Sequence, residues 1–146
     1  MEKSKMSFAQ GVASGFRGLF RLSGRARRME LFSYGLVVTL VWLGVVALLF
    51  NLWKEVPQVI VTGIPFLYMF LMLGVVWRRY QDVGQEGYLA FVLYAVLYGI
   101  SVEFGFEGEE ILKLVLTGIA GLLFYWLMQD GQPERNAHGP SPKYME

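Results

Sequence analysis

The sequence has no cysteine and only one histidine, His138, among its 146 residues. The absence of cysteine excludes disulfides and thiolate metal ligands. A single histidine excludes a histidine-rich metal centre and argues against a serine–histidine or cysteine–histidine pair of the kind that activates catalytic nucleophiles. We therefore expect a protein that is not an enzyme and has no catalytic, cofactor-binding or metal-binding residues.

Charged residues are also scarce. They make up 17% of the chain, whereas hydrophobic residues make up 55%. Typical soluble domains have about 25% charged and roughly 45–50% apolar residues. The chain has the length of one domain, residues 1–146. This composition argues against a soluble domain and indicates a membrane protein.

The apolar residues are gathered into four long segments. The first has 23 residues without a formal charge. At about 1.5 Å per residue, a helix of that length crosses a hydrocarbon core of roughly 30 Å. We predict an all-α integral membrane protein with four transmembrane helices over residues 31–53, 56–77, 87–106 and 111–128, a loop over 78–86 and a tail over 129–146.

Lysine and arginine are distributed unevenly about these segments. Eleven of the 13 basic residues lie in residues 1–30, 78–86 and 129–146, and the opposite side has only Lys54 and Lys113. Cytoplasmic loops of membrane proteins are enriched in lysine and arginine, so we expect both termini to lie in the cytoplasm.

The basic N-terminal segment, residues 1–30, contains a possible amphipathic helix. Apolar residues recur at helical spacing and arginines follow a neighbouring stripe: Phe8, Val12, Phe16 and Leu19, then Arg17, Arg21, Arg25 and Arg28. This pattern is typical of a helix in the membrane interface. Three glycines in the segment each cost about 1 kcal/mol of helix propensity relative to alanine, so a disordered basic arm is the alternative. We expect no cleavable signal peptide, because polar residues interrupt the apolar ones.

Each expected cytoplasmic segment carries a compact polar motif, at residues 24–30, 78–87 and 131–142. All three emerge at the same membrane face, so we predict that they form one cluster. Its candidate members are Arg25, Arg27, Arg28, Glu30, Arg78, Arg79, Asp82, Gly84, Asn136, Gly139 and Pro140. Asp82 follows Arg78 and Arg79 by four and three residues, and we expect it to pair with arginines of the first or second motif.

The arginines of the cluster have two interpretations. They can set the topology and contact anionic lipid, or they can form a site for a phosphate, nucleotide or acidic peptide, which guanidinium groups bind bidentately. Asp82 and Glu30 weaken a general anion site and favour an internal ion-pair network that clamps the helix ends. We expect the tail to fold back onto this network through Asn136 and Gly139; a disordered tail is the alternative.

Together the motifs resemble a family of small bacterial inner-membrane proteins of unknown function, the YhaH/YhaI type. That family carries, in the same order, the patterns G-R-x-R-R-x-E, R-R-x-x-D-x-G-x-x-G and G-x-x-x-x-N-x-x-G-P-x-P. The resemblance implies four spans, a location in the bacterial inner (plasma) membrane and a cytoplasmic cluster, but no activity. Many relatives have histidine where this chain has Gln81, so a proton or metal held by that histidine would have no equivalent here.

Two functions stay open from the sequence. The first is a structural or regulatory membrane component whose basic cytoplasmic face engages a protein or the anionic phospholipid headgroups of the lipid bilayer. The alternative is a small transporter or passive channel, although no segment has an ionisable residue at mid-depth, as coupled transporters usually do. We expect no nucleic-acid partner. Gly118 and Gly121 could pack within the bundle or against a second copy, which leaves the oligomeric state open.

Overall fold

The computed structural model describes residues 5–143. This part of the chain contains five helices. Its helices, in chain order, are α1 (Phe8–Arg17), α2 (Arg28–Leu52), α3 (Gln58–Asp82), α4 (Leu89–Ser101) and α5 (Glu109–Met128). The predicted all-α class is confirmed. Residues 1–4 of the N-terminal segment and the end of the tail lie outside the described residues.

Three of the helices are long and apolar enough to cross a membrane: α2 and α3, with 25 residues each, and α5, with 20. Helix α4 has only 13 residues, which is about 20 Å of helix against a hydrocarbon core of roughly 30 Å. The prediction of one helix over residues 87–106 is therefore wrong at its end. Beyond Ser101 the chain leaves the helix, and Gly105 and Gly108 take up left-handed backbone, with φ of +69° and +91°. Glycine adopts that conformation without steric cost.

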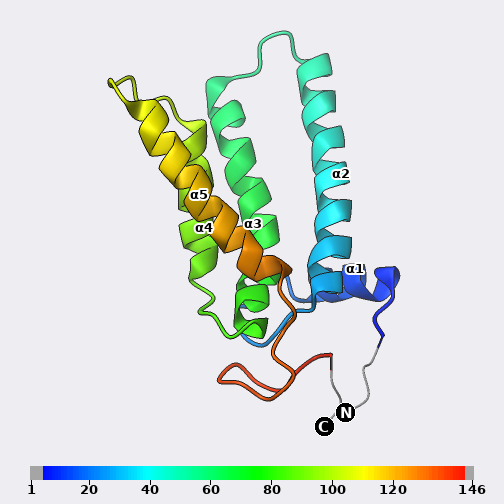
Figure 1. Cartoon of the computed structure of the whole chain (residues 1–146). Helices are drawn as coiled ribbons and strands as arrows, with labels where there is room; N and C mark the ends of the chain where they lie inside the picture. Colours follow the sequence, from blue (N-terminus) through cyan, green and yellow to red (C-terminus); the bar gives the residue numbers. More distant parts are fainter. Residues whose placement is uncertain (1–4, 144–146) are drawn as a thin grey trace.

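The connections between helices lie at two ends of the bundle (Figure 1). The α2–α3 and α4–α5 connections lie at one end, and α1, the α3–α4 connection and the described tail lie at the other. Helix α1 lies across the N-terminal end of α2 rather than along it. The three polar motifs therefore meet at the end that carries α1, as the sequence predicted.

The apolar core is concentrated in the half of the bundle next to α1. It includes buried side chains from α2, α3, α4 and α5, such as Tyr34, Val75, Tyr80, Leu93 and Leu127. Two tyrosine hydroxyls donate to main-chain carbonyls here, Tyr34 to Leu71 at 2.8 Å and Tyr80 to Leu123 at 3.2 Å. The far half of α2 leaves most of its apolar side chains exposed, as lipid-facing helices do.

A capping box supports the formation of α1, and two glycines determine where it packs against α2. Ser7 and Gln10 form a capping box at its N-terminus. A Cβ at Gly11 would lie 2.1 Å from the Oγ of Ser33, and one at Gly15 would lie 2.3 Å from the Cγ of Tyr34. The glycines that lower the helix propensity of α1 are thus the positions where it touches α2. Of the two sequence-based alternatives, the structure has the helix.

The polar run at residues 78–86, predicted as a loop, begins as the last turn of α3. Arg78, Arg79 and Asp82 are helical and buried. The helix continues because these side chains find partners while the backbone keeps its helical hydrogen bonds. The turn that follows depends on Gly84, which has a φ of +80°.

Gly118 and Gly121 of α5 do not mediate packing among the described residues. A Cβ at either position would meet no atom within 4 Å among the described residues. Their small-residue face is therefore not part of the packing between the five helices.

The surroundings of two glycines, Gly15 in α1 and Gly118 in α5, predict different outcomes for their substitution by alanine. Gly15→Ala should destabilise the protein by about 1–3 kcal/mol, because the added methyl group overlaps Tyr34. Gly118→Ala should be neutral or slightly stabilising, since it adds helix propensity in open space. Thermal unfolding of both variants in the same detergent measures the difference. Equal melting temperatures would contradict the docking.

Candidate functional site

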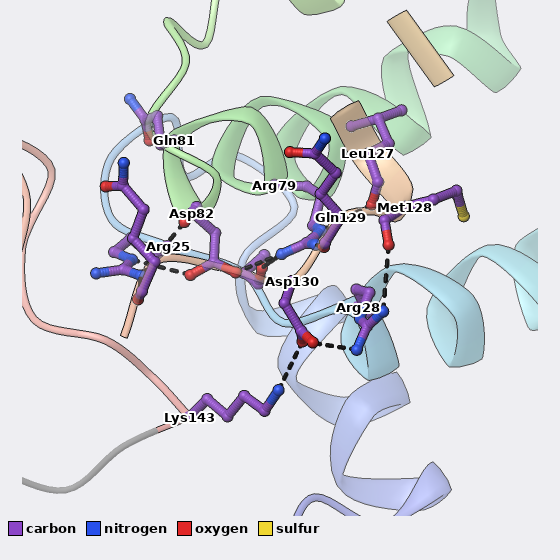
Figure 2. Close-up of polar contacts among 12 residues, drawn as sticks. Arg25, Arg28, Arg79, Gln81, Asp82, Leu127, Met128, Gln129, Asp130 and Lys143 are labelled. Atoms are coloured by element: carbon purple, nitrogen blue, oxygen red, sulfur yellow. Dashed lines mark hydrogen bonds and ion pairs between the residues drawn. The ribbon is translucent and has the colours of Figure 1, made fainter. Parts of the chain in front are cut away.

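Asp82, the last residue of α3, lies at the centre of a buried polar cluster (Figure 2). Its Oδ1 accepts from Arg25 Nε at 2.9 Å, and its Oδ2 pairs with Arg79 Nη1. The carboxylate and both guanidinium groups are almost fully buried. The expected pairing of Asp82 with arginines of the first or second motif is confirmed, and each motif contributes one arginine.

The other donors of Arg79 bind main-chain carbonyls. Its Nε donates to Leu127 at 2.9 Å, its Nη1 donates to Ala26 at 3.3 Å, and its Nη2 donates to Gln129. Leu127 lies in the last turn of α5, where helix carbonyls lack intrahelical partners. A cation at that end also interacts favourably with the helix dipole. Arg79 therefore terminates α5 while it neutralises Asp82.

Arg25 binds main-chain carbonyls of the tail, as Arg79 binds those at the end of α5. Its Nη1 donates to the carbonyls of Glu134 and Gly139 at 2.7 and 3.3 Å, and its Nη2 donates to that of Gln132. The Nη2 group also donates to the carbonyl of Asp82 at 3.3 Å. One side chain from the first motif thus holds the tail against the end of α3.

The tail makes its own bonds to α3. The backbone N–H of Gln132 donates to the carbonyl of Asp82 at 2.9 Å, and Asn136 Nδ2 donates to that of Gln81, also at 2.9 Å. Asn136 and Gly139 close a small loop through two backbone hydrogen bonds of 3.1 Å. A Cβ at Gly131 would lie 2.0 Å from Asp82 Oδ2. The tail folds back as the sequence predicted.

Arg78 and Glu30 form a second buried pair beside the first. Arg78 Nη2 lies 2.8 Å from Glu30 Oε1, and its Nε donates to the carbonyl of Gly74 at 3.1 Å. A Cβ at Gly18 would lie 2.0 Å from Arg78 Nη2. The pair joins the N-terminus of α2 to α3 and to the segment after α1. The two adjacent arginines of the middle motif therefore have different carboxylate partners.

Arg27 and Arg28 lie closer to the surface than the other cluster arginines. Arg28 Nη2 pairs with Asp130 Oδ1 at 2.6 Å, and its Nη1 donates to the carbonyl of Met128 at 3.2 Å. Lys143 Nζ binds the same Asp130 oxygen at 2.6 Å. Burial lowers the pKa of the Arg27 guanidinium, and the Asp82 and Glu30 carboxylates oppose that shift. An arginine remains protonated despite such a shift.

Gln81 and Gly84 complete the contacts of the middle motif, whereas Pro140 is exposed. With its amide oriented to satisfy both neighbours, Gln81 donates to the carbonyl of Gly24 at 2.7 Å and accepts from Trp77 Nε1 at 3.1 Å. A Cβ at Gly84 would lie 2.2 Å from the side-chain Nε2 of Gln132. The glutamine therefore has a bridging role that needs neither a metal nor a mobile proton.

Sequence reasoning missed three residues of the site: Asp130, Gln132 and Lys143. Gly131 was recognised as the first residue of the tail motif but was not a candidate member of the cluster, and Asp130 stands next to it. Gln132 acts mainly through its backbone, and Lys143 reaches Asp130 only because the tail folds back. Neither leaves a local sequence pattern.

The polar atoms of Asp82, Arg25 and Arg79 are committed to one another and to the backbone. Both carboxylate oxygens have a guanidinium partner, and the guanidinium groups donate to carbonyls of α5 and the tail. An added anion would have to displace these bonds. The geometry of this centre therefore suits a clamp between chain segments better than an open anion site.

Comparison with known proteins identifies the family. The family model described as "Protein of unknown function (DUF805)" matches residues 19–140, which include the first two motifs and residues 131–140 of the third. No curated protein and no solved structure matches the chain. The chain belongs to this family of unknown function.

The cluster predicts a contrast between two aspartates that each bind two cations. Asp82→Asn should destabilise the protein by about 3–5 kcal/mol, because it leaves two buried guanidinium groups without their counter-charge. Asp130→Asn should cost about 0–1 kcal/mol, because its ion pairs are exposed. Denaturation in detergent compares the two variants. A loss at Asp130 as large as that at Asp82 would contradict the assignment.

Proposed function

We propose that this member of the DUF805 family is a structural or regulatory membrane component that engages anionic lipid or a protein through one basic end. In this proposal the chain crosses a bacterial inner membrane four times, with both termini and the polar cluster in the cytoplasm. It is of the YhaH/YhaI type, and its role involves no catalysis. The apolar helices and the family match fit a membrane protein, and the finer role is our inference.

One observation carries the proposal: the basic residues gather at the end of the bundle that also holds α1. Among the described residues, only Lys54 and Lys113 are associated with the opposite end. An asymmetry of this kind is typical of cytoplasmic faces. Basic residues near an anionic membrane surface each contribute about 1 kcal/mol of attraction.

The cluster divides the arginines of this end into two groups. Arg25, Arg78 and Arg79 are buried and hold chain segments together. Exposed arginines, such as Arg17 and Arg21, lie in or next to α1. Helix α1 also exposes apolar side chains, which suits a helix lying in the membrane interface. The buried group forms the clamp, and the outer group faces the partner.

The four-span topology predicts which introduced cysteines react from outside. The chain has no native cysteine, so each added thiol is the only one. A membrane-impermeant maleimide added to spheroplasts should label Glu55→Cys and Glu107→Cys, and should label Ala137→Cys only after permeabilisation. Labelling of Ala137→Cys in sealed spheroplasts, as three crossings would require, would refute the topology.

The proposed engagement of anionic lipid predicts what co-purifies with the chain. Mild detergent extraction should yield protein enriched in anionic over zwitterionic phospholipid, relative to the bulk membrane. Changing Arg17, Arg21 and Arg135 to glutamine should reduce that enrichment several-fold, because each contributes about 1 kcal/mol. Lys54→Gln, at the opposite end, is the matched control.

A protein that co-purifies with the native chain and is lost from the triple variant, but not from Lys54→Gln, would support the protein-binding form of the proposal. Solute flux through reconstituted liposomes, with no lipid or protein enrichment, would favour a channel and contradict the proposal.

A further inference from the structure

A pocket of about 530 Å³ lies beside the cluster, between the start of α2, the end of α5 and the tail. Arg79 and Asp82 contribute to its lining from the cluster. Arg27, Arg28 and Lys143 line it together with Asp130. The pocket thus shares residues with the clamp but extends beyond it to side chains near the surface.

The described part of the pocket lining has more cations than carboxylates. Within it Arg79 pairs with Asp82, and its other charged side chains are the cations Arg27, Arg28 and Lys143 and the carboxylate of Asp130. The first turn of α2 also contributes to the lining, and its dipole favours an anion there. The net charge suits a ligand with one or two negative charges.

Asp130 marks the place where an anionic oxygen is held. Its Oδ1 alone receives both Arg28 Nη2 and Lys143 Nζ, each at 2.6 Å (Figure 2). The side chains of Asp130 and Arg28 are 61% and 42% exposed, so a ligand can reach them and the carboxylate can turn away. A non-bridging phosphate oxygen could take its place between the two cations, because guanidinium and ammonium groups bind phosphate well.

The other part of the lining is apolar. Met29 and Phe32 from the first turns of α2, and Met128 from the last turn of α5, line the pocket and are partly exposed. These side chains lie on helices long and apolar enough to cross a membrane. A free phosphate or a soluble sugar phosphate would leave this part of the pocket without a partner. A ligand with an anionic head and hydrocarbon chains would cover both parts.

We infer that the pocket binds an anionic glycerophospholipid, with its phosphate between Arg28 and Lys143 and its acyl chains along Phe32 and Met128. The inference rests on the proposed function and assigns a specific site on the basic end. Zwitterionic lipids bind more weakly, because their ammonium group faces the excess positive charge. Asp130 competes with the lipid for Arg28 and Lys143, so it weakens binding rather than supporting it.

The test uses the full chain, purified in a non-ionic detergent, and three soluble probes: dihexanoyl phosphatidylglycerol, dihexanoyl phosphatidylcholine and glycerol phosphate. Titration calorimetry or native mass spectrometry gives the affinities. Phosphatidylglycerol should bind saturably and roughly tenfold or more tightly than the other two. Glycerol phosphate binding as tightly as phosphatidylglycerol would overturn the lipid assignment, and so would equal binding of the two lipids.

Five variants assign the binding to the pocket. Lys143→Gln and Arg28→Gln should each weaken phosphatidylglycerol binding about tenfold, the loss expected for one charge-assisted hydrogen bond. Asp130→Asn should strengthen it several-fold. Arg21→Gln, which changes an exposed arginine outside the pocket lining, should weaken it clearly less than Lys143→Gln. Lys54→Gln, at the opposite end of the bundle and also outside the lining, is the matched control and should have no effect. Thermal unfolding of the unliganded variants checks that each is folded, and Lys143, at the edge of the described tail, is the substitution least able to perturb the fold.

Two failures are distinguishable. If phosphatidylglycerol binds but Arg21→Gln weakens it as much as Lys143→Gln, the basic end attracts lipid without this pocket, and only the present inference fails. If neither the native chain nor any variant prefers the anionic lipid, the inference fails together with the lipid-binding form of the proposed function.

Discussion

The pairing of one carboxylate, Asp82, with two buried arginines is the interaction on which the rest of the site depends. Burying an isolated charge costs several kcal/mol, so the group must be fully paired and hydrogen-bonded. Asp82 meets this condition only when Arg25 arrives from the segment before α2 and Arg79 from its own helix. Those arginines in turn need the carbonyls of α5 and the tail. Four parts of the chain are therefore fixed by one requirement for charge compensation.

Close backbone approach is the second constraint, and glycine provides it. Gly131 lets the tail pass against the Asp82 carboxylate, and Gly18 leaves room for the Arg78 guanidinium. A Cβ at Gly74 would lie 2.3 Å from the carbonyl oxygen of Leu19, so α3 touches the backbone that follows α1. Each of these glycines lies beside a buried ion pair or supports an element that carries one. The clamp and its close packing form one unit.

The sequence predicts the apolar helices and the role of Asp82 because both follow from local patterns. Uncharged segments of sufficient length indicate membrane helices, and an acid inserted among arginines, three residues after Arg79, favours an internal ion pair. The partner of Arg78 was not predictable, because two adjacent arginines look equivalent until the three-dimensional position of Glu30 is known. The helical state of α1 was open for a related reason: its glycines look like helix breakers until α2 is seen against them.

The pocket was beyond sequence reasoning altogether. It forms only where the N-terminal end of α2, the C-terminal end of α5 and the tail meet. Lys143 lines it because the tail folds back to this place. In the motif comparison the arginines formed a single basic group. The structure separates them by burial: Arg25, Arg78 and Arg79 are buried and form the clamp, whereas Arg28 is partly exposed, and we propose that it contacts the ligand.

A double-mutant cycle between Arg25 and Asp82 tests most directly whether the clamp is a real energetic unit. The unfolding free energies of Arg25→Gln, Asp82→Asn, the double variant and the native chain would be measured in one detergent. Residues in direct ionic contact should show a coupling energy of about 1–3 kcal/mol, with the double variant less destabilised than the sum of the singles. Additivity within about 0.5 kcal/mol would mean that the two side chains act independently, and it would contradict the central role of their pairing.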